Sequence, residues 1–276
     1  MNKQHIAPQI FLRAWPFPQG AGRLMDRFFR DLTFEEEVTT VKTTDGFNLS
    51  VMPNELIGRH LYMTGEFDRA NVEVLLKHAR PGDILLDIGA NIGYVSACFL
   101  AKVRDSRVIA VEPQPQTVDL LRSNLSQFGA RANVAPVAIS DQEGDGFLQI
   151  DRVNRGASKL VSEGSGQSAR VELWTPARLF DTFKPPKVDL VKIDVEGHEE
   201  AVFRALQPSL AEFRPRLILF EAHEDQAAPT SIIGGLLTRL GYSVHGIQKK
   251  LTRLEFPPVR SSSDCRYNDY IALYRE

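Results

Sequence analysis

Short apolar runs and longer segments with helical spacing alternate along most of the chain. The apolar runs have strand length and are expected to form parallel strands covered on both faces; they span 84–88, 107–112, 133–139, 189–194 and 215–221. Segments with apolar residues at helical spacing lie between or after them, at 94–103, 115–128, 176–183, 199–206 and 231–240. Residues 242–247 and 270–274 are expected to add an antiparallel pair at one edge. The pattern predicts an α/β fold.

The first 66 residues follow a different pattern. Residues 1–22 mix prolines, aromatics and polar residues without a period and are expected to form an irregular arm, lying across the domain or across a neighbouring subunit in an oligomer. Residues 23–32 have helical spacing, and β-branched runs on both sides of Asp45-Gly46 predict a hairpin. We therefore expect an N-terminal extension over 1–66 and one main domain over 67–276.

The run at 84–88 leads directly into a turn with two glycines. Gly89 and Gly93 allow a tight turn and a close approach to a ligand, and Asp87 lies at the strand end. An acid there suits hydroxyl or ammonium groups, and the turn lacks the G-x-G-x-x-G pattern of a pyrophosphate site. Glu112 ends the next strand, 19 residues after Gly93, where an acid normally binds a ribose diol. This favours S-adenosylmethionine, with a dehydrogenase cofactor as the alternative.

Three motifs together resemble the FkbM family of S-adenosylmethionine-dependent methyltransferases. They are Asp87-Ile-Gly-Ala-Asn-Ile-Gly93, Val111-Glu-Pro113 and Lys192-Ile-Asp-Val-Glu-Gly-His-Glu199, and the resemblance extends from about Val38 to the C-terminus. It implies a Rossmann-like class I methyltransferase fold, with a seven-stranded, mostly parallel sheet and helices on both faces. One departure is Thr175-Pro-Ala177, where the family usually has Thr-Leu-Asp. The role of that aspartate is therefore not carried over.

The resemblance also implies a set of cofactor-binding residues. They are Asp87, Gly89, Asn91, Gly93, Glu112, Asp68, Ala138 and Asp141. For Asp68 the alternative is a helix N-cap. For Asp141, which with Ala138 lies where this fold holds the adenine, the alternative is a turn cap.

The candidate catalytic residues are Asp194, His198 and Glu221, with His223 as a further candidate. Methyl transfer to an alcohol is an in-line displacement that needs alignment and a base, and imidazole and carboxylate groups can serve. Alternatively, Asp194 contacts the methionine part of the cofactor and His198 is only structural. A magnesium site formed by Asp194, Glu196, His198 and Glu221 is not favoured, because an extended segment fixes no geometry for them. No metal is expected.

Composition narrows the choice of partners. The formal net charge is −2 and the pI is near 6.3, which gives no basic footprint for nucleic acid. We see no secretion signal and no apolar run of membrane-spanning length, and two unrelated cysteines fit a reducing compartment, so a cytoplasmic location is expected. Residues 151–168 are expected to form a polar loop near the active site that either contacts an anionic or sugar substrate or is only solvated, with Arg152, Asn154, Arg155, Ser158 and Lys159.

The expected function is O-methylation of a hydroxyl on a sugar, a glycan or a polyketide-type metabolite. The acceptor is therefore expected to be a small molecule or saccharide. The alternative is a non-catalytic nucleoside-binding or scaffold protein that has kept the fold.

Overall fold

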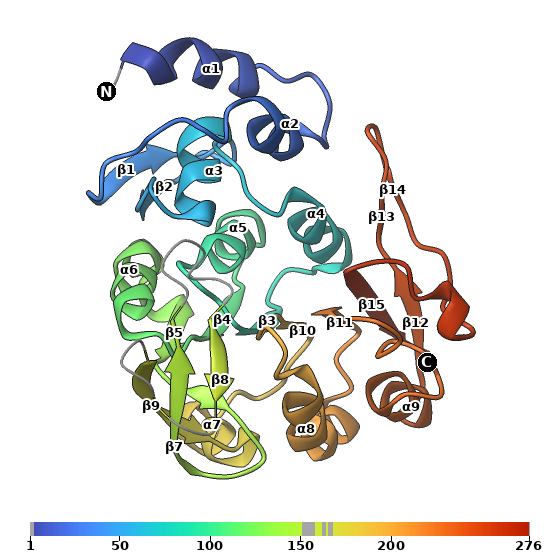
Figure 1. Cartoon of the computed structure of the whole chain (residues 1–276). Helices are drawn as coiled ribbons and strands as arrows, with labels where there is room; N and C mark the ends of the chain where they lie inside the picture. The colour runs from blue at the N-terminus through green and yellow to red at the C-terminus, as the bar shows by residue number, and fades with distance from the viewer. Residues whose placement is uncertain (1–2, 151–157, 162–163, 165–167, 276) are drawn as a thin grey trace.

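A seven-stranded sheet forms the centre of the computed structural model, which describes residues 3–150, 158–161, 164 and 168–275 (Figure 1). Its strand order is β12-β15-β11-β10-β3-β4-β5. The strands are β3 (Ile84–Ile88), β4 (Arg107–Val111), β5 (Ala132–Ala135), β10 (Leu190–Ile193), β11 (Leu217–Glu221), β12 (Tyr242–Gly246) and β15 (Asp269–Tyr274). In this sheet β15 pairs antiparallel with both of its neighbours, β11 and β12, and the other neighbouring strands pair parallel. The predicted α/β class with a mostly parallel sheet is confirmed.

Helices cover both faces of this sheet (Figure 1). On one face lie α4 (Arg69–His78), α5 (Tyr94–Lys102) and α6 (Pro115–Leu125), and on the other lie α7 (Pro176–Phe183), α8 (Glu199–Phe213) and α9 (Ile232–Arg239). Each layer buries its own apolar cluster. In β3, Leu85 belongs to the cluster of α4 to α6, whereas Leu86 and Ile88 belong to the other. Because both faces are covered, β3 is apolar along nearly its whole length.

The N-terminal elements pack on the α4 to α6 side (Figure 1). They are α1 (Lys3–Arg13), α2 (Ala21–Phe28), β1 (Thr39–Lys42), β2 (Asn48–Val51) and α3 (Leu56–Thr64). The predicted hairpin is confirmed, with Thr39 paired to Val51. The predicted irregular arm is wrong over residues 3–13, which form a helix despite Pro8. Contacts with α3 outweigh the proline: Leu12 is buried, and the Gln9 side-chain amide donates to the Tyr62 carbonyl at 2.6 Å.

A second sheet of four strands, in the order β6-β9-β7-β8, follows β5. Its strands are β6 (Ala138–Ile139), β7 (Gly144–Gln149), β8 (Lys159–Val161) and β9 (Ser168–Trp174). The single strand predicted over 133–139 is therefore wrong in its second half. Pro136 has no N–H to donate to a ladder, so the main-sheet strand ends at Ala135 and the chain turns to the second sheet.

Two 3₁₀ segments and one short hairpin also occur among the described residues, and a predicted helix end shifts. After α6 a 3₁₀ segment covers Ser126–Arg131, and another covers Ser262–Asp264. The short strands β13 (Gln248–Lys249) and β14 (Leu254–Glu255) form a hairpin that projects from the domain (Figure 1). The helix predicted over 199–206 continues to Phe213 as α8. Within the described ranges, no helix combines the length and the apolar character needed to cross a membrane.

Candidate active site

A pocket opens at the carboxyl ends of β3, β4 and β10 and contains about 1130 Å³ of empty space, part of it continuous with solvent. We call it the strand-end pocket. Seven predicted site residues line it: Asp68, Gly89, Asn91, Glu112, Ala138, Asp194 and His198. Four others are not among its lining residues: Asp87, Gly93, Asp141 and Glu221. Crevices at this edge of a parallel sheet are the usual ligand sites of α/β proteins.

The turn at Gly89 is fixed by neighbouring strands. Gly89 has a φ of +79°, and a Cβ placed on it would lie 1.7 Å from the backbone oxygen of Asp194. Its N–H and that of Ala90 both donate to the Val111 carbonyl, at 2.9 and 3.0 Å. The glycine is therefore required by its contact with the end of β10, whatever ligand the turn meets. Asn91 also has a positive φ, and its side-chain oxygen accepts the Ile92 N–H at 2.7 Å.

Glu112 presents a buried carboxylate to the pocket, with 7% of the residue exposed. One oxygen accepts the Asn91 N–H and the other accepts the Gln114 N–H, both at 3.0 Å. Burial raises the pKa of Glu112 to about 7, although both backbone donors lower it. Each carboxylate oxygen can accept more than one hydrogen bond, so the group retains capacity for a pair of hydroxyls.

Lys192 lies buried beneath the pocket and joins three parts of the site. Its ammonium donates to the Gly89 carbonyl at 3.0 Å and lies 3.4 Å from Asp87 Oδ1 and 3.3 Å from Asp194 Oδ2. Burial lowers the pKa of Lys192, but the surrounding carboxylates outweigh burial and the pKa is raised. Lys192 is therefore charged. Asp87 also accepts the Ser96 hydroxyl at 2.6 Å. Because Asp87 contacts Lys192 but is not among the residues that line the pocket, it acts on the site through Lys192.

Lys192 opens the motif Lys192–Glu199, but no role was expected for it from the sequence. A lysine inside a buried parallel strand was the signal, because such a charge needs a partner at the same level of a neighbouring strand. Lys192 is in register with Asp87 across β10 and β3.

The remaining cofactor candidates lie in different surroundings. Asp68 precedes α4, yet its side chain makes no cap hydrogen bond with the helix; instead it accepts the Asn71 side-chain amide at 2.8 Å. Burial, with the nearby Asp269, raises the pKa of Asp68 to about 7. Ala138 is buried in the pocket wall. The Asp141 carboxylate is exposed and lies 3.3 Å from the Ser140 hydroxyl.

His198 and Asp194 bring proton-accepting groups to the same pocket. His198 precedes α8, does not cap it through its side chain, and has a buried Nε2 with no hydrogen-bond partner among the described residues. Burial lowers the pKa of His198, although Glu199 and Asp141 oppose this, so the imidazole is neutral near neutral pH. The Asp194 side chain is 41% exposed and is paired with Lys192.

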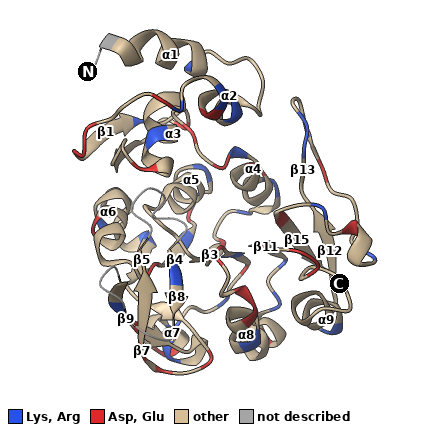
Figure 2. Ribbon diagram, viewed as in Figure 1, with Lys and Arg blue, Asp and Glu red and all other residues tan. Residues whose placement is uncertain are grey.

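Glu221 and Asp269 lie outside the pocket lining, beside Asp194 and Glu196, and we call these four carboxyl groups the acidic edge. Burial, followed by the charges of Asp194, Glu196 and Asp269, raises the pKa of Glu221 to about 8. Glu221 and Asp269 are in register across β11 and β15, and Asp269 pairs with Lys249 at 2.7 Å. Figure 2 shows acidic residues at the beginning of α8 and in the β11 and β15 region. Asp269 was not among the expected site residues, although its place directly before the edge strand expected over 270–274 was a signal.

The second sheet also reaches the pocket. Leu148 of β7 and Leu160 of β8 line it, as does Ser158, whose hydroxyl lies 3.3 Å from the side-chain oxygen of Gln114. Lys159 belongs to β8, and Ser168 begins β9, so the loop predicted over 151–168 is wrong at 159–161 and at 168, where the chain pairs with β7. The other candidates of the predicted loop lie outside the described residues; they are Arg152, Asn154 and Arg155.

Comparisons with known proteins identify a family model and several relatives that this chain resembles. The Methyltransferase FkbM domain model matches residues 87–244. Hexuronic acid methyltransferase AglP of Haloferax volcanii is 30% identical over 187 residues, which cover 67% of this chain and 74% of that protein. Protein-L-isoaspartate O-methyltransferase 1 of Arabidopsis thaliana is 31% identical over 94 residues, covering 32% of this chain and 41% of that protein.

A solved structure of Methyltransferase FkbM from Methylobacillus flagellatus KT has a TM-score of 0.47 and 15% identity, covering 78% of this chain and 52% of that one. The family model matches more than half of the chain, and the relative from Haloferax volcanii extends over about two thirds of it. The resemblance found in the sequence motifs is thereby confirmed, and this chain belongs to the FkbM methyltransferase family.

Proposed function

We propose that this protein transfers a methyl group from S-adenosylmethionine to a hydroxyl group of a saccharide, with a polyketide-type metabolite as the second acceptor class. Membership of the FkbM family supports methyl transfer. The relative named hexuronic acid methyltransferase supports a saccharide acceptor, and sugars present mainly hydroxyl groups. The geometry of the strand-end pocket supports both parts of the proposal.

The residues of the pocket fit S-adenosylmethionine. Glu112 offers acceptor oxygens for the two ribose hydroxyls, and the apolar wall at Ala138 suits the adenine. Asp68 and Asp194 offer carboxylates for the ammonium group of the methionine part. Asp87 in β3 and Gly93 before α5 lie outside the pocket lining and would hold the turn between them in place. We give no cofactor role to Asp141, because its exposed carboxylate lies outside the pocket lining.

The chain's own residues would align the acceptor and remove its proton. When bound, S-adenosylmethionine supplies a methyl carbon activated by the sulfonium and leaves as S-adenosylhomocysteine. His198 Nε2 would take the proton of the acceptor hydroxyl, and the bound cofactor would supply the methyl carbon to that oxygen and keep the carbon–sulfur electron pair on its sulfur. Asp194, held by Lys192, and Glu221 at the next strand end orient the hydroxyl. The products are a methyl ether, the thioether and a protonated base.

The observation that carries this proposal is that His198 and Asp194 line the same pocket as Glu112, and that the buried His198 Nε2 has no hydrogen-bond partner in the described part of the chain. The test is to incubate the full chain with S-adenosylmethionine and saccharides ending in uronic acids or in neutral sugars. Formation of a methyl ether, seen by mass spectrometry together with S-adenosylhomocysteine release, is expected first with the uronic acids. If the cofactor binds but no saccharide is methylated, the acceptor class is wrong; if it does not bind, the whole proposal fails.

A further inference from the structure

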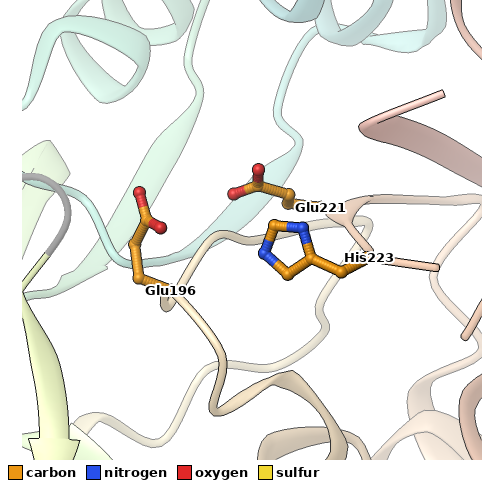
Figure 3. Close-up of side chains that lie close together, drawn as sticks. All are labelled: Glu196, Glu221 and His223. Carbon is orange, nitrogen blue, oxygen red and sulfur yellow. The ribbon is translucent and has the colours of Figure 1, made fainter.

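Two carboxylates and an imidazole meet at the ends of β10 and β11. Glu196 lies in the segment between β10 and α8, Glu221 ends β11, and His223 follows two residues later. One ligand atom from each side chain lies within 4.8 Å of the other two. Figure 3 shows the carboxyl groups of Glu196 and Glu221 and the His223 ring around a common space. The three side chains therefore present two oxygens and one nitrogen to one point.

The backbone that carries these side chains is held on both strands. On the β10 side, the Asp194 N–H donates to the Ile88 carbonyl at 3.0 Å, and the Gly197 N–H donates to the buried Glu199 carboxylate at 2.8 Å. On the β11 side, the Ala222 N–H donates to the Asn268 carbonyl at 2.9 Å, and the His223 N–H donates to the Gln226 side chain at 3.0 Å. The arrangement is therefore set by the fold rather than by free rotation of two loops.

The two carboxylates have no cationic partner in contact. Across the described residues, neither Glu196 nor Glu221 forms an ion pair with a lysine or arginine, and no hydrogen bond is seen to the His223 ring. Of the neighbouring lysines, Lys192 pairs with Asp194 and Lys249 with Asp269, while the charge of Lys159 acts on Glu196 from beyond ion-pair distance. Within the described residues, a cation at this point would therefore meet carboxyl oxygens that are not in contact with a lysine or arginine, and the imidazole adds a lone pair rather than another charge.

We propose that Glu196, Glu221 and His223 bind one divalent cation of the Mn²⁺ type. Carboxylate oxygens suit Mg²⁺ and Mn²⁺, and an imidazole ligand shifts the preference toward a transition metal. Three protein ligands leave coordination positions open for water or substrate. The proposal departs from the sequence-based expectation of no metal, which rested on the lack of fixed geometry along one extended segment. His223, in the segment that follows β11, supplies a ligand that the expected set of Asp194, Glu196, His198 and Glu221 did not contain.

The role of the cation rests on the proposed function. Its open positions would bind the acceptor hydroxyl and lower the pKa of that hydroxyl beside the strand-end pocket, as bound divalent cations do for water. They would also bind the carboxylate of a uronic acid acceptor, which the acidic edge would otherwise repel. The cation would thus allow an anionic saccharide to approach an edge that carries several carboxyl groups.

The test is titration of Mn²⁺ into the full chain without cofactor or acceptor, with free Mn²⁺ followed by electron paramagnetic resonance. We expect one saturable site. Glu196→Gln, Glu221→Gln and His223→Gln should each weaken Mn²⁺ binding about tenfold or more, since each removes a ligand. Glu224→Gln is the matched control, because Glu224 is an exposed acid next to His223 that lies outside the cluster, and it should bind as the wild type does. Circular dichroism checks that every variant is folded.

The cation site would be overturned if the folded wild type showed no saturable Mn²⁺ binding. It would also be overturned if the control and the three ligand variants weakened Mn²⁺ binding equally, because that would indicate attraction to general negative charge. Failure of this inference is distinguishable from failure of the proposed function. Saccharide methylation that persists without any Mn²⁺ binding refutes only the cation site. Stoichiometric Mn²⁺ binding lost in the ligand variants upholds the site even if no saccharide is methylated.

Discussion

Replacing Glu112 with glutamine is expected to change how the free energy of unfolding depends on pH. Burial raises the pKa of Glu112 from 4.5 to about 7 in the folded chain, whereas an unfolded chain restores the ordinary value. Between these values the folded state keeps a proton that the unfolded state has released. The stabilisation from this proton is therefore complete below the unfolded pKa and is lost as pH rises through about 7.

The size of the effect follows from the shift. One pKa unit corresponds to about 1.4 kcal/mol, so Glu112 alone removes about 3 kcal/mol of stability between about pH 4 and about pH 8. Glutamine cannot release a proton, so the variant lacks this component. It also leaves the N–H of Asn91 or Gln114 without an acceptor, which costs about 1 to 3 kcal/mol at every pH and does not alter the slope.

Urea unfolding of ligand-free wild type and Glu112→Gln, at intervals from about pH 5 to about pH 8, measures the difference. Other titrating groups are common to both chains and cancel. Glu212→Gln on the exposed side of α8 is the control and should follow the wild-type curve. Glu112→Gln should also weaken S-adenosylmethionine binding about tenfold to a hundredfold. A constant difference in unfolding free energy between the two chains across this pH range would refute the reasoning.

Three further substitutions test the rest of the site. Gly89→Ala should lower the free energy of unfolding, measured in urea, by several times the roughly 1 kcal/mol that Gly82→Ala costs. Both glycines have a positive φ, but only at Gly89 would the Cβ meet a backbone carbonyl. Equal losses in the two variants would contradict this. His198→Ala should lower turnover about a hundredfold to ten-thousandfold with little change in cofactor affinity. In the wild type, turnover should fall at acid pH, with the fall lying below pH 6.5 because burial lowers the pKa of His198. Turnover of the variant within a few-fold of wild type would exclude a role for His198 as the base. Lys192→Met should lower the free energy of unfolding by about 3 to 5 kcal/mol, because the carboxylates of Asp87 and Asp194 lose their buried partner. Lys102 is half exposed, so Lys102→Met should lower it by less than about 1 kcal/mol. Similar losses in the two variants would argue against the buried network.

The cofactor side of the site could be predicted because its signals are local. An apolar strand, a glycine turn and a helix occupy consecutive residues around Gly89, and Glu112 ends the next strand, so parallel pairing brings the two together. The reason for the glycine could not be predicted, because the Asp194 carbonyl that it contacts lies about a hundred residues later in the chain.

The parts that sequence patterns did not predict depend on contacts between distant segments. The helix at 3–13 has a proline inside and little periodicity, and it is held by α3 through Leu12 and Gln9. The cluster of Glu221 with His223 and Glu196 requires knowledge of how the ends of β10 and β11 lie against each other. Periodicity identifies a strand but does not place the side chains that follow its last residue.

The first and last strands of the second sheet, β6 and β9, pair with each other, and this affects how the sequence of the segment between them can change. Ala138 pairs with Leu173 and Ile139 with Trp174, so the segment between them leaves and rejoins the domain at one place. Changing the length of such a closed segment costs little chain entropy and leaves the pairing of the main sheet unchanged. Leu148 and Leu160 carry this segment to the pocket wall. A single contiguous exchange, from 140 to 172, would therefore present a new wall to the acceptor while the turn at Gly89 and the carboxylate of Glu112 are inherited unaltered.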